Sequence, residues 1–171
     1  EREPQLVSAQ IQDVVADVVE LMQVRAREAH VELELQSDPQ IPLLVFDPDG
    51  LHRAILNVVT NAIDACEKRE QGRVLVVTEY DREKGLLRVH VADNGEGIPA
   101  DDVIKVFSVF ESRKGSRGTG LGLPVSQKIL REHGGDILVE STVNVGSRFT
   151  LELPAVAPAT SDSPTLTDDQ V

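Results

Sequence analysis

A four-residue interval separates Arg53, Asn57 and Asn61 in a stretch whose apolar spacing predicts a helix, so the three side chains would line one edge of its buried stripe. Asparagine is a poor helix former, and its amide oxygen suits a hard cation such as Mg²⁺. One interpretation is a cation site at Asn61. The alternative, favoured for either asparagine alone, is an amide that bonds nearby backbone or faces water.

A second candidate motif is Asp93-Asn94-Gly95-Glu96-Gly97, which follows a predicted strand. Glycines let the backbone approach a flat ligand, and a carboxylate just before them can accept a hydrogen bond from an exocyclic amine such as that of adenine. An aspartate can equally cap a tight turn, so the motif alone supports a structural role for Asp93 about as well.

A glycine-rich segment, Gly118-Thr119-Gly120-Leu121-Gly122, stands immediately before a predicted helix. Backbone N–H groups and the helix dipole favour anions there, and three glycines leave room for phosphate. The segment matches neither the G-x-x-x-x-G-K-[ST] loop nor the G-x-G-x-x-G turn. It predicts a phosphate cradle, with a flexible hinge that caps the helix as the alternative.

These motifs lie at the ends of a series of predicted elements. Apolar periodicity predicts helices over 8–29, 49–66 with Asp49 as the cap, and 121–133 with Gly134-Gly135 as the stop. Alternation predicts strands over 31–36, 43–46, 73–80, 86–92, 136–141 and 147–153, with 73–80 and 86–92 forming an antiparallel hairpin. We therefore expect an α+β fold of two layers, in which helices cover one face of a mixed, mostly antiparallel sheet.

Composition narrows the class of protein. The net charge of −12 argues against a protein that grips nucleic acid by its phosphates. The single cysteine, Cys66, excludes an internal disulfide and fits a reducing compartment, so we expect a cytoplasmic location, with a full-length protein that could be membrane-anchored. The end of the chain is rich in Pro, Ser, Thr and Asp, so we expect one domain over 1–154 and a disordered acidic tail or linker over 155–171.

Taken in order, four segments resemble the ATP-binding catalytic domain of sensor histidine kinases, in the group shared with DNA gyrase, Hsp90 and MutL. They are LHRAILNVVTNAIDAC, VADNGEGIP, VFSVFESRKGSRGTGLGLPVSQKILREHGGDI and VGSRFTLELP. The resemblance covers roughly residues 5–154. It implies a Bergerat-type ATP-binding fold that takes ATP or ADP together with Mg²⁺.

The resemblance also implies roles for single residues. Asn61 would be the Mg²⁺ ligand, Asn57 would support the phosphates, and Asp93 would bind adenine with help from Thr150 through a water. The implied nucleotide contacts are Asn57, Asn61, Asp64, Asp93, Gly95, Gly97, Ile98, Phe107, Lys114, Gly118, Thr119, Gly120, Leu121, Gly122 and Thr150. Asn57, Asn61 and Lys114 would serve the phosphoryl transfer itself.

The segment that matches the mobile lid of the family departs from the common pattern. Phe107 and Phe110 match its phenylalanine pair, but Val109 stands where a proline is common. Lys114 matches the phosphate-contacting lysine, with Arg113 and the nearby Arg117 as alternative cations. At Asp64 and Ala65 some subfamilies carry Lys and Tyr, and this difference suggests the nitrogen-regulation and dicarboxylate-sensor type of kinase.

The chain lacks the acceptor that a histidine kinase needs. None of its four histidines, His30, His52, His90 and His133, has the sequence context of the family's acceptor helix. We therefore expect the acceptor on a separate dimerisation domain upstream and a response regulator receiver domain as the next partner. We expect this chain alone to be monomeric, without nucleic-acid or membrane contact. The alternative function is a regulatory module that senses ATP or ADP without phosphotransfer.

Overall fold

The computed structural model describes residues 2–108 and 122–159. The elements are β1 (Val7–Ala9), α1 (Ile11–Glu28), β2 (Glu32–Gln36), β3 (Leu44–Phe46), α2 (Pro48–Ala65), β4 (Arg73–Asp81), β5 (Leu86–Asp93), α3 (Ala100–Val103), the 3-10 helix η1 (Ile104–Phe107), α4 (Gly122–Glu132), β6 (Asp136–Thr142) and β7 (Gly146–Pro154). The expected helices and strands are present, with ends shifted by at most three residues.

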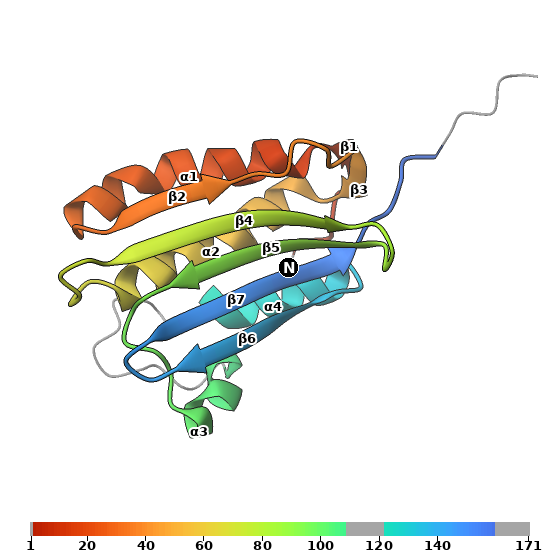
Figure 1. Cartoon of the computed structure of the whole chain (residues 1–171). Coiled ribbons are helices and arrows are strands. Elements are labelled where there is room, and N and C mark those ends of the chain that lie inside the picture. Colours follow the sequence, from red (N-terminus) through yellow and green to blue (C-terminus); the bar gives the residue numbers. More distant parts are fainter. Residues whose placement is uncertain (1, 109–121, 160–171) are drawn as a thin grey trace, which may run out of the picture.

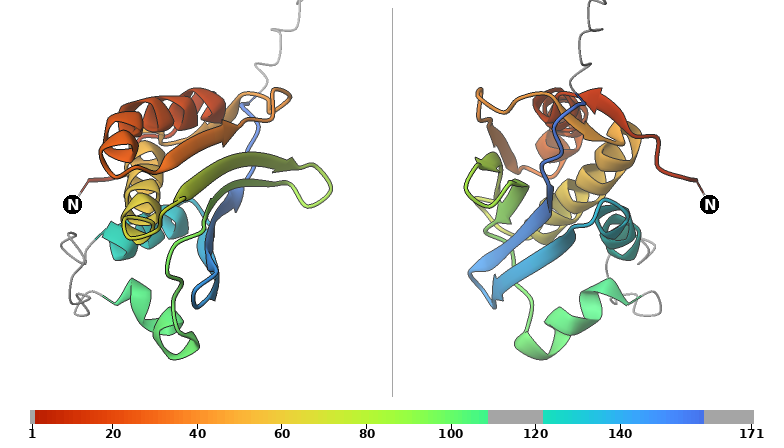
Figure 2. Two further views of the ribbon diagram at one scale, coloured as in Figure 1. Left: turned by 60° about the vertical axis from the view of Figure 1, so that its left-hand side comes forward. Right: turned by 90° about the vertical axis from the view of Figure 1, so that its right-hand side faces the viewer.

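The central sheet has five strands in the order β2-β4-β5-β7-β6. Strand β2 pairs with β4 in parallel, and the other neighbours pair antiparallel. Helices α1, α2 and α4 lie on one side of this sheet (Figures 1 and 2). The predicted two-layer α+β fold, with the predicted hairpin of β4 and β5, is therefore confirmed.

Helix α2 lies between α1 and α4 in the helical layer and buries a long apolar stripe. Its buried apolar side chains are Leu51, Ala54, Ile55, Val58, Val59, Ala62 and Ile63. Each large aliphatic side chain buried in this way contributes roughly 1.5–3 kcal/mol. The helix begins at Pro48 after Asp47, so the predicted cap at Asp49 is wrong: proline presets the first helical turn and needs no N–H partner.

The first helix begins later than its periodicity predicts. Residues Val7–Ala9 form strand β1, which pairs antiparallel with β3, so that Ala9 lies opposite Leu44. Helix α1 starts only at Ile11. The pairing partner is distant in the sequence, and local periodicity therefore could not indicate it.

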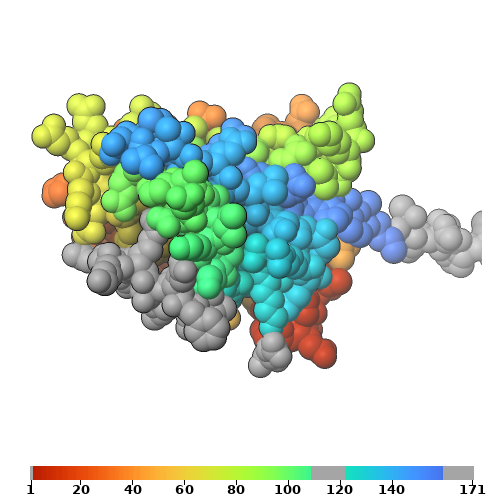
Figure 3. Space-filling view, turned by 90° about the horizontal axis from the view of Figure 1, so that it is seen from below, coloured from red at the N-terminus to blue at the C-terminus, as the bar shows by residue number. Residues whose placement is uncertain are grey.

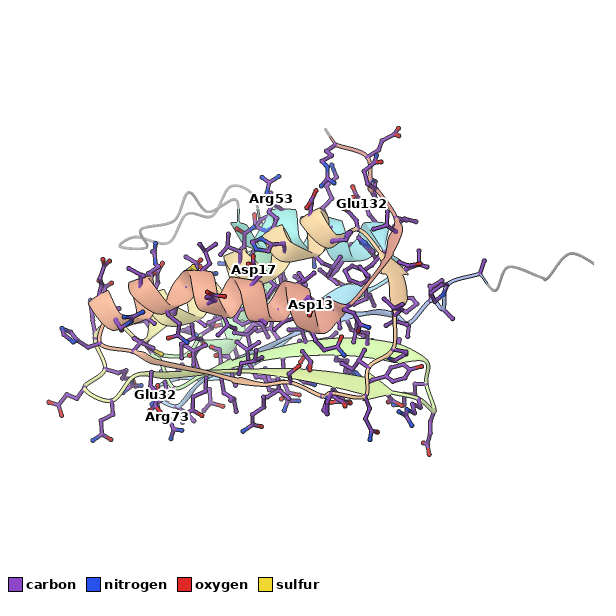
Figure 4. All side chains as sticks on the ribbon, turned by 90° about the horizontal axis from the view of Figure 1, so that it is seen from above. Asp13, Asp17, Glu32, Arg53, Arg73 and Glu132 are labelled. Atoms are coloured by element: carbon purple, nitrogen blue, oxygen red, sulfur yellow. The ribbon has the colours of Figure 1, made fainter. Side chains whose placement is uncertain are left out.

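The outer face of the sheet carries polar side chains. Arg88 of β5 donates to Glu79 and Asp81 of β4 and to Glu152 of β7, with N–O distances of 2.7, 3.1 and 2.8 Å. Figure 4 shows Arg73, which pairs with Glu32, on the side of the strands away from α1. These charges satisfy one another on a face that no described helix covers.

Backbone hydrogen bonds continue past Pro154, the last residue of the predicted domain. The N–H of Ala155 donates to the carbonyl of Gly85, and the N–H of Val45 donates to the carbonyl of Val156. Residues 155 and 156 thus extend the ordered domain, and residues 160–171 lie outside the described part of the chain.

The stretch after Pro99 forms α3 and η1, which lie beside β6 and α4 (Figure 3). No helix within residues 2–108 and 122–159 is long and apolar enough to cross a membrane.

Candidate functional site

The last turn of α2 meets the loop that follows β5. A Cβ at Gly95 would overlap the carbonyl oxygen of Ala65, so only glycine allows the loop to pack this closely on the helix. The N–H of Glu96 donates to the same Ala65 oxygen at 3.3 Å. This contact places Asp93, at the end of β5, beside the C-terminal half of α2.

Asp93 is a half-buried carboxylate held by backbone. Its Oδ1 accepts a hydrogen bond from the N–H of Gly95 at 2.9 Å. Burial raises the pKa of Asp93 to about 6, and hydrogen bonds from the backbone of Gly95 and Ser147 oppose that rise. A carboxylate that is partly shielded from water in this way can accept one further, well-directed hydrogen bond from a ligand.

The other glycine of the motif lies against the β6–β7 hairpin. Gly97, with φ +72°, packs on the backbone of Thr142. The next residue, Ile98, is buried and donates its N–H to Ser141 Oγ at 2.7 Å. The structure thus brings Gly95, Gly97 and Ile98 into one loop beside Asp93.

The other end of the site is formed where α4 begins. Asn57 Nδ2 donates to the carbonyl of Gly122 at 3.1 Å, which ties α2 to the first turn of α4. Helix α4 then runs along α2 toward the N-terminus of α2. Two hydrogen bonds mark this course: Ser126 Oγ donates to the carbonyl of Ala54, and the Asp47 N–H donates to His133 Nε2. The N-terminus of α4, with its positive dipole end, therefore opens beside the C-terminal half of α2.

Asn61 lies one turn beyond Asn57, on the part of α2 that α4 leaves uncovered. Its side chain is exposed and, within the described residues, makes no hydrogen bond. Between Asp93 and the start of α4, its amide oxygen is free to bind a ligand.

Several predicted site residues lie outside the described residues. They are Phe110, Arg113, Lys114, Arg117, Gly118, Thr119, Gly120 and Leu121. Phe107, the first phenylalanine of the predicted pair, ends η1 and packs half-buried on the core.

The structure moves two predicted contacts away from the site. Thr150 lies on the outer face of the sheet, where its Oγ1 and His90 Nδ1 are 2.9 Å apart. The carboxylate of Asp64 faces α1, where Arg25 Nη2 donates to its two oxygens at 2.8 and 3.1 Å. Strand alternation explains the first displacement, and the packing of α1 on α2 explains the second, so we retain neither as a nucleotide contact.

Sequence reasoning missed Ser147. It lies directly opposite Asp93 across the β5–β7 pair and is 7% exposed. Its Oγ lies 2.7 Å from Ser141 Oγ. The signal was available, because Ser147 shares the strand parity of the buried Phe149 and Leu151, whereas Thr150 has the opposite parity.

Three histidines are engaged in structural contacts. His52 Nε2 lies 2.7 Å from Asp17, and His90 Nε2 lies 2.8 Å from Glu79. His133 Nδ1 lies 2.8 Å from the carbonyl of Ile129, while its Nε2 accepts from the Asp47 N–H.

A model of the family "Histidine kinase-, DNA gyrase B-, and HSP90-like ATPase" matches residues 46–157. This range includes α2, the loop after β5 and the start of α4. The chain belongs to this family. The ATPase-family chain is 35% identical over 149 residues to the sensor histidine kinase ZraS of Klebsiella oxytoca, covering 86% of this chain and 31% of ZraS. It therefore spans about a third of that relative.

Two solved structures resemble this member of the ATPase family. Full-length ShkA in complex with AMPPNP matches with a TM-score of 0.81 and 30% identity, over 92% of this chain and 33% of ShkA. Histidine kinase ThkA in complex with the response regulator protein TrrA matches with a TM-score of 0.75 and 26% identity, over 91% of this chain and 43% of that one.

The ligand atoms available at the site indicate which kind of metal ion it could bind. Within the described residues, no three His, Cys, Asp or Glu side chains gather in a way that could hold a metal ion. Asn61 offers a single neutral amide oxygen. Such a site fits Mg²⁺, which keeps several waters and takes further oxygens from substrate phosphates, better than a metal caged by protein ligands.

Proposed function

We propose that this chain binds Mg-ATP and transfers the γ-phosphoryl group to a histidine on a separate dimerisation domain, as in two-component signalling. One observation carries the proposal. Helix α2 connects a half-buried acceptor, Asp93, at its C-terminal end to Asn61, Asn57 and the N-terminus of α4. This layout matches a ligand with a hydrogen-bonding base at one end and a polyanion at the other.

The base would lie at the loop after β5. The Asp93 carboxylate would accept from the exocyclic amine of adenine, and Ser147 lies beside it to support that contact. Gly95 and Gly97 let this loop pack closely on the end of α2 and on Thr142, which keeps the loop beside Asp93.

The phosphates would lie along α2 toward the start of α4. The first N–H groups of α4 and its dipole favour the negative charge, and Asn57 fixes the position of this helix end through Gly122. When bound at Asn61, Mg²⁺ would neutralise phosphate charge. Lys114, or one of the neighbouring arginines, would supply a further cation.

The chemistry that this arrangement supports is positioning with charge neutralisation. In the transfer, the bond from the γ-phosphorus to its bridging oxygen breaks, a bond to the acceptor imidazole nitrogen forms, and ADP leaves. Asn57 stands where gyrase-type relatives carry an acid, and an amide cannot remove a proton from water. We therefore expect slow hydrolysis in the absence of the acceptor.

The partners extend the proposal. The acceptor domain would precede this chain in the full-length protein, and a receiver domain would take the phosphoryl group from it. The match to ThkA in complex with TrrA supports the second partner. We further propose a cytoplasmic location, a monomeric state for this chain alone, and the nitrogen-regulation and dicarboxylate-sensor type.

Phosphotransfer is tested by incubating the chain with γ-labelled ATP, Mg²⁺ and the proposed acceptor domain. We expect an acid-labile, alkali-stable label on the acceptor. Asn61→Ala should reduce labelling at least about tenfold, which corresponds to about 1.4 kcal/mol of lost metal and phosphate binding. The matched control is Gln40→Ala, which removes an exposed amide from the loop between β2 and β3.

Nucleotide binding is tested by thermal unfolding with and without Mg-ATP. At about 100 times the dissociation constant, the nucleotide should stabilise the chain by about 2.7 kcal/mol. Stabilisation without any label would contradict phosphotransfer and support the nucleotide-sensing module. Absence of stabilisation would contradict both functions.

A further inference from the structure

One peptide group of the loop after β5 is held at both ends. Arg69, in the connection between α2 and β4, donates Nη2 to the carbonyl of Gly95 at 2.9 Å. The N–H of the same peptide group, on Glu96, donates to the Ala65 carbonyl at the end of α2. The loop therefore cannot tilt away from α2 without breaking one of these bonds.

The preceding peptide group of the same loop holds Asp93. Its N–H, on Gly95, donates to Asp93 Oδ1. The two peptide groups are joined at the Cα of Gly95. The hydrogen bond from Arg69 to the Gly95 carbonyl therefore also restrains the Gly95 N–H, which holds the Asp93 carboxylate.

Asn94 fastens the loop to the same connection. Its Oδ1 accepts from the N–H of Arg73 at 2.7 Å, and its Nδ2 donates to the carbonyl of Gln71 at 2.8 Å. The loop is thus attached at Ala65, Arg69, Gln71 and Arg73, all in one stretch of chain that ends α2 and begins β4.

We propose that Arg69 is a positioning residue that sets the direction of the Asp93 carboxylate and thereby the preference for adenine over guanine. The inference rests on the proposed function. Adenine offers an amine donor at the position where guanine carries a carbonyl oxygen, so a fixed carboxylate attracts the first base and repels the second. A carboxylate free to turn would discriminate less.

The chemistry of arginine suits this position. Its guanidinium stays charged, and a hydrogen bond from a charged donor is stronger than one between neutral groups. Arg69 is half-buried, whereas the adjacent Lys68 is exposed. Lys68 therefore offers a control that removes a cation from the same connection without touching the loop.

The test compares ATP and GTP binding by calorimetry, with Mg²⁺, for the unaltered chain, Arg69→Met, Arg69→Lys and Lys68→Ala. We expect Arg69→Met to lower the ratio of the GTP to the ATP dissociation constant about tenfold. Arg69→Lys, which keeps a charged donor, should recover part of that ratio. Lys68→Ala should leave it unchanged.

The pH dependence of ATP binding supplies a second readout, scanned between about pH 5 and pH 8. Asp93 is the group expected to titrate there, because burial raises its pKa to about 6, whereas burial raises the pKa of the adjacent Cys66 thiol to about 11. Arg69→Met should shift the midpoint, because it removes a cation and loosens the loop beside Asp93, whereas Lys68→Ala should leave the midpoint unchanged.

A lower melting temperature of Arg69→Met with an unchanged ratio and midpoint would overturn the inference and leave the proposed function intact. If that variant does not fold, Arg69→Gln, which is too short to reach Gly95, is measured in its place against the same two outcomes. An unaltered chain that binds neither nucleotide would instead overturn the proposed function, and the inference with it.

Discussion

Asp93 is a residue at which binding and stability oppose each other. Burial raises its pKa to about 6, although backbone N–H groups of Gly95 and Ser147 favour the charged form. The folded chain therefore holds a proton at this carboxyl more tightly than the unfolded chain does. The contribution of this group to stability is favourable at low pH and is lost as the pH rises through about 6.

Asp93→Asn should therefore stabilise the nucleotide-free chain while it removes adenine binding. At neutral pH we expect the free energy of unfolding to rise by about 3 kcal/mol, since the pKa of Asp93 rises from its ordinary 3.8 to about 6 and each tenfold change in the ionisation equilibrium corresponds to about 1.4 kcal/mol. Urea unfolding at several pH values measures this gain, which should disappear below about pH 4, where Asp93 is protonated in both states. A variant that is less stable than the unaltered chain at neutral pH would contradict the raised pKa.

At the scale of the elements, the pairing of β5 with β7 decides what surrounds Asp93. The two strands meet closely at Gly146, where φ is +142° and a Cβ would overlap the carbonyl oxygen of Asp93. This close approach brings Ser147 opposite Asp93.

Gly146→Ala should destabilise the chain and weaken nucleotide binding together. We expect a loss of about 2–4 kcal/mol, from overpacking against backbone and from the strained φ, as measured by thermal unfolding and calorimetry. Gly85→Ala is the control, because Gly85 also has a positive φ but has open space around its Cα. It should cost only about 1 kcal/mol and leave binding unchanged. Equal losses for the two variants would show that the close approach at Gly146 has no role.

The way in which α4 packs along α2 decides which part of α2 can bind a ligand. Helix α4 covers the N-terminal half of α2 and stops at Asn57, which leaves Asn61 open. The exposed edge of α2 is thus divided into a packed part and a part that can bind a ligand.

At the scale of the whole molecule, the domain ends beyond its last strand. The backbone of Ala155 and Val156 bonds the β4–β5 turn and β3, and β3 in turn pairs with β1 near the N-terminus. The C-terminal residues thus join two parts of the chain that are far apart in sequence (Figure 1).

A chain that ends at residue 154 should therefore be less stable than one that ends at residue 159. We expect a difference of about 1–3 kcal/mol, since each of the two lost backbone hydrogen bonds contributes about 0.5–1.5 kcal/mol. Thermal unfolding of the two shortened chains measures it. Identical melting temperatures would place the end of the domain at Pro154, as composition alone suggested.

The sequence alone determined the helices, the β4–β5 hairpin and the position of Asn57 and Asn61 on one edge of α2, because the periodicity of neighbouring residues carries that information. It also determined the Asp93 motif and the family resemblance. Strand parity also distinguishes Ser147, which shares the parity of the buried residues of β7, from Thr150 on the opposite face. Only the tertiary structure showed that Arg25 forms an ion pair with Asp64 and that β1 pairs with β3. It also showed that Arg69 and Asn94 hold the loop beside Asp93. These contacts join residues distant in sequence, and their formation depends on how the folded layers pack, which no local pattern records.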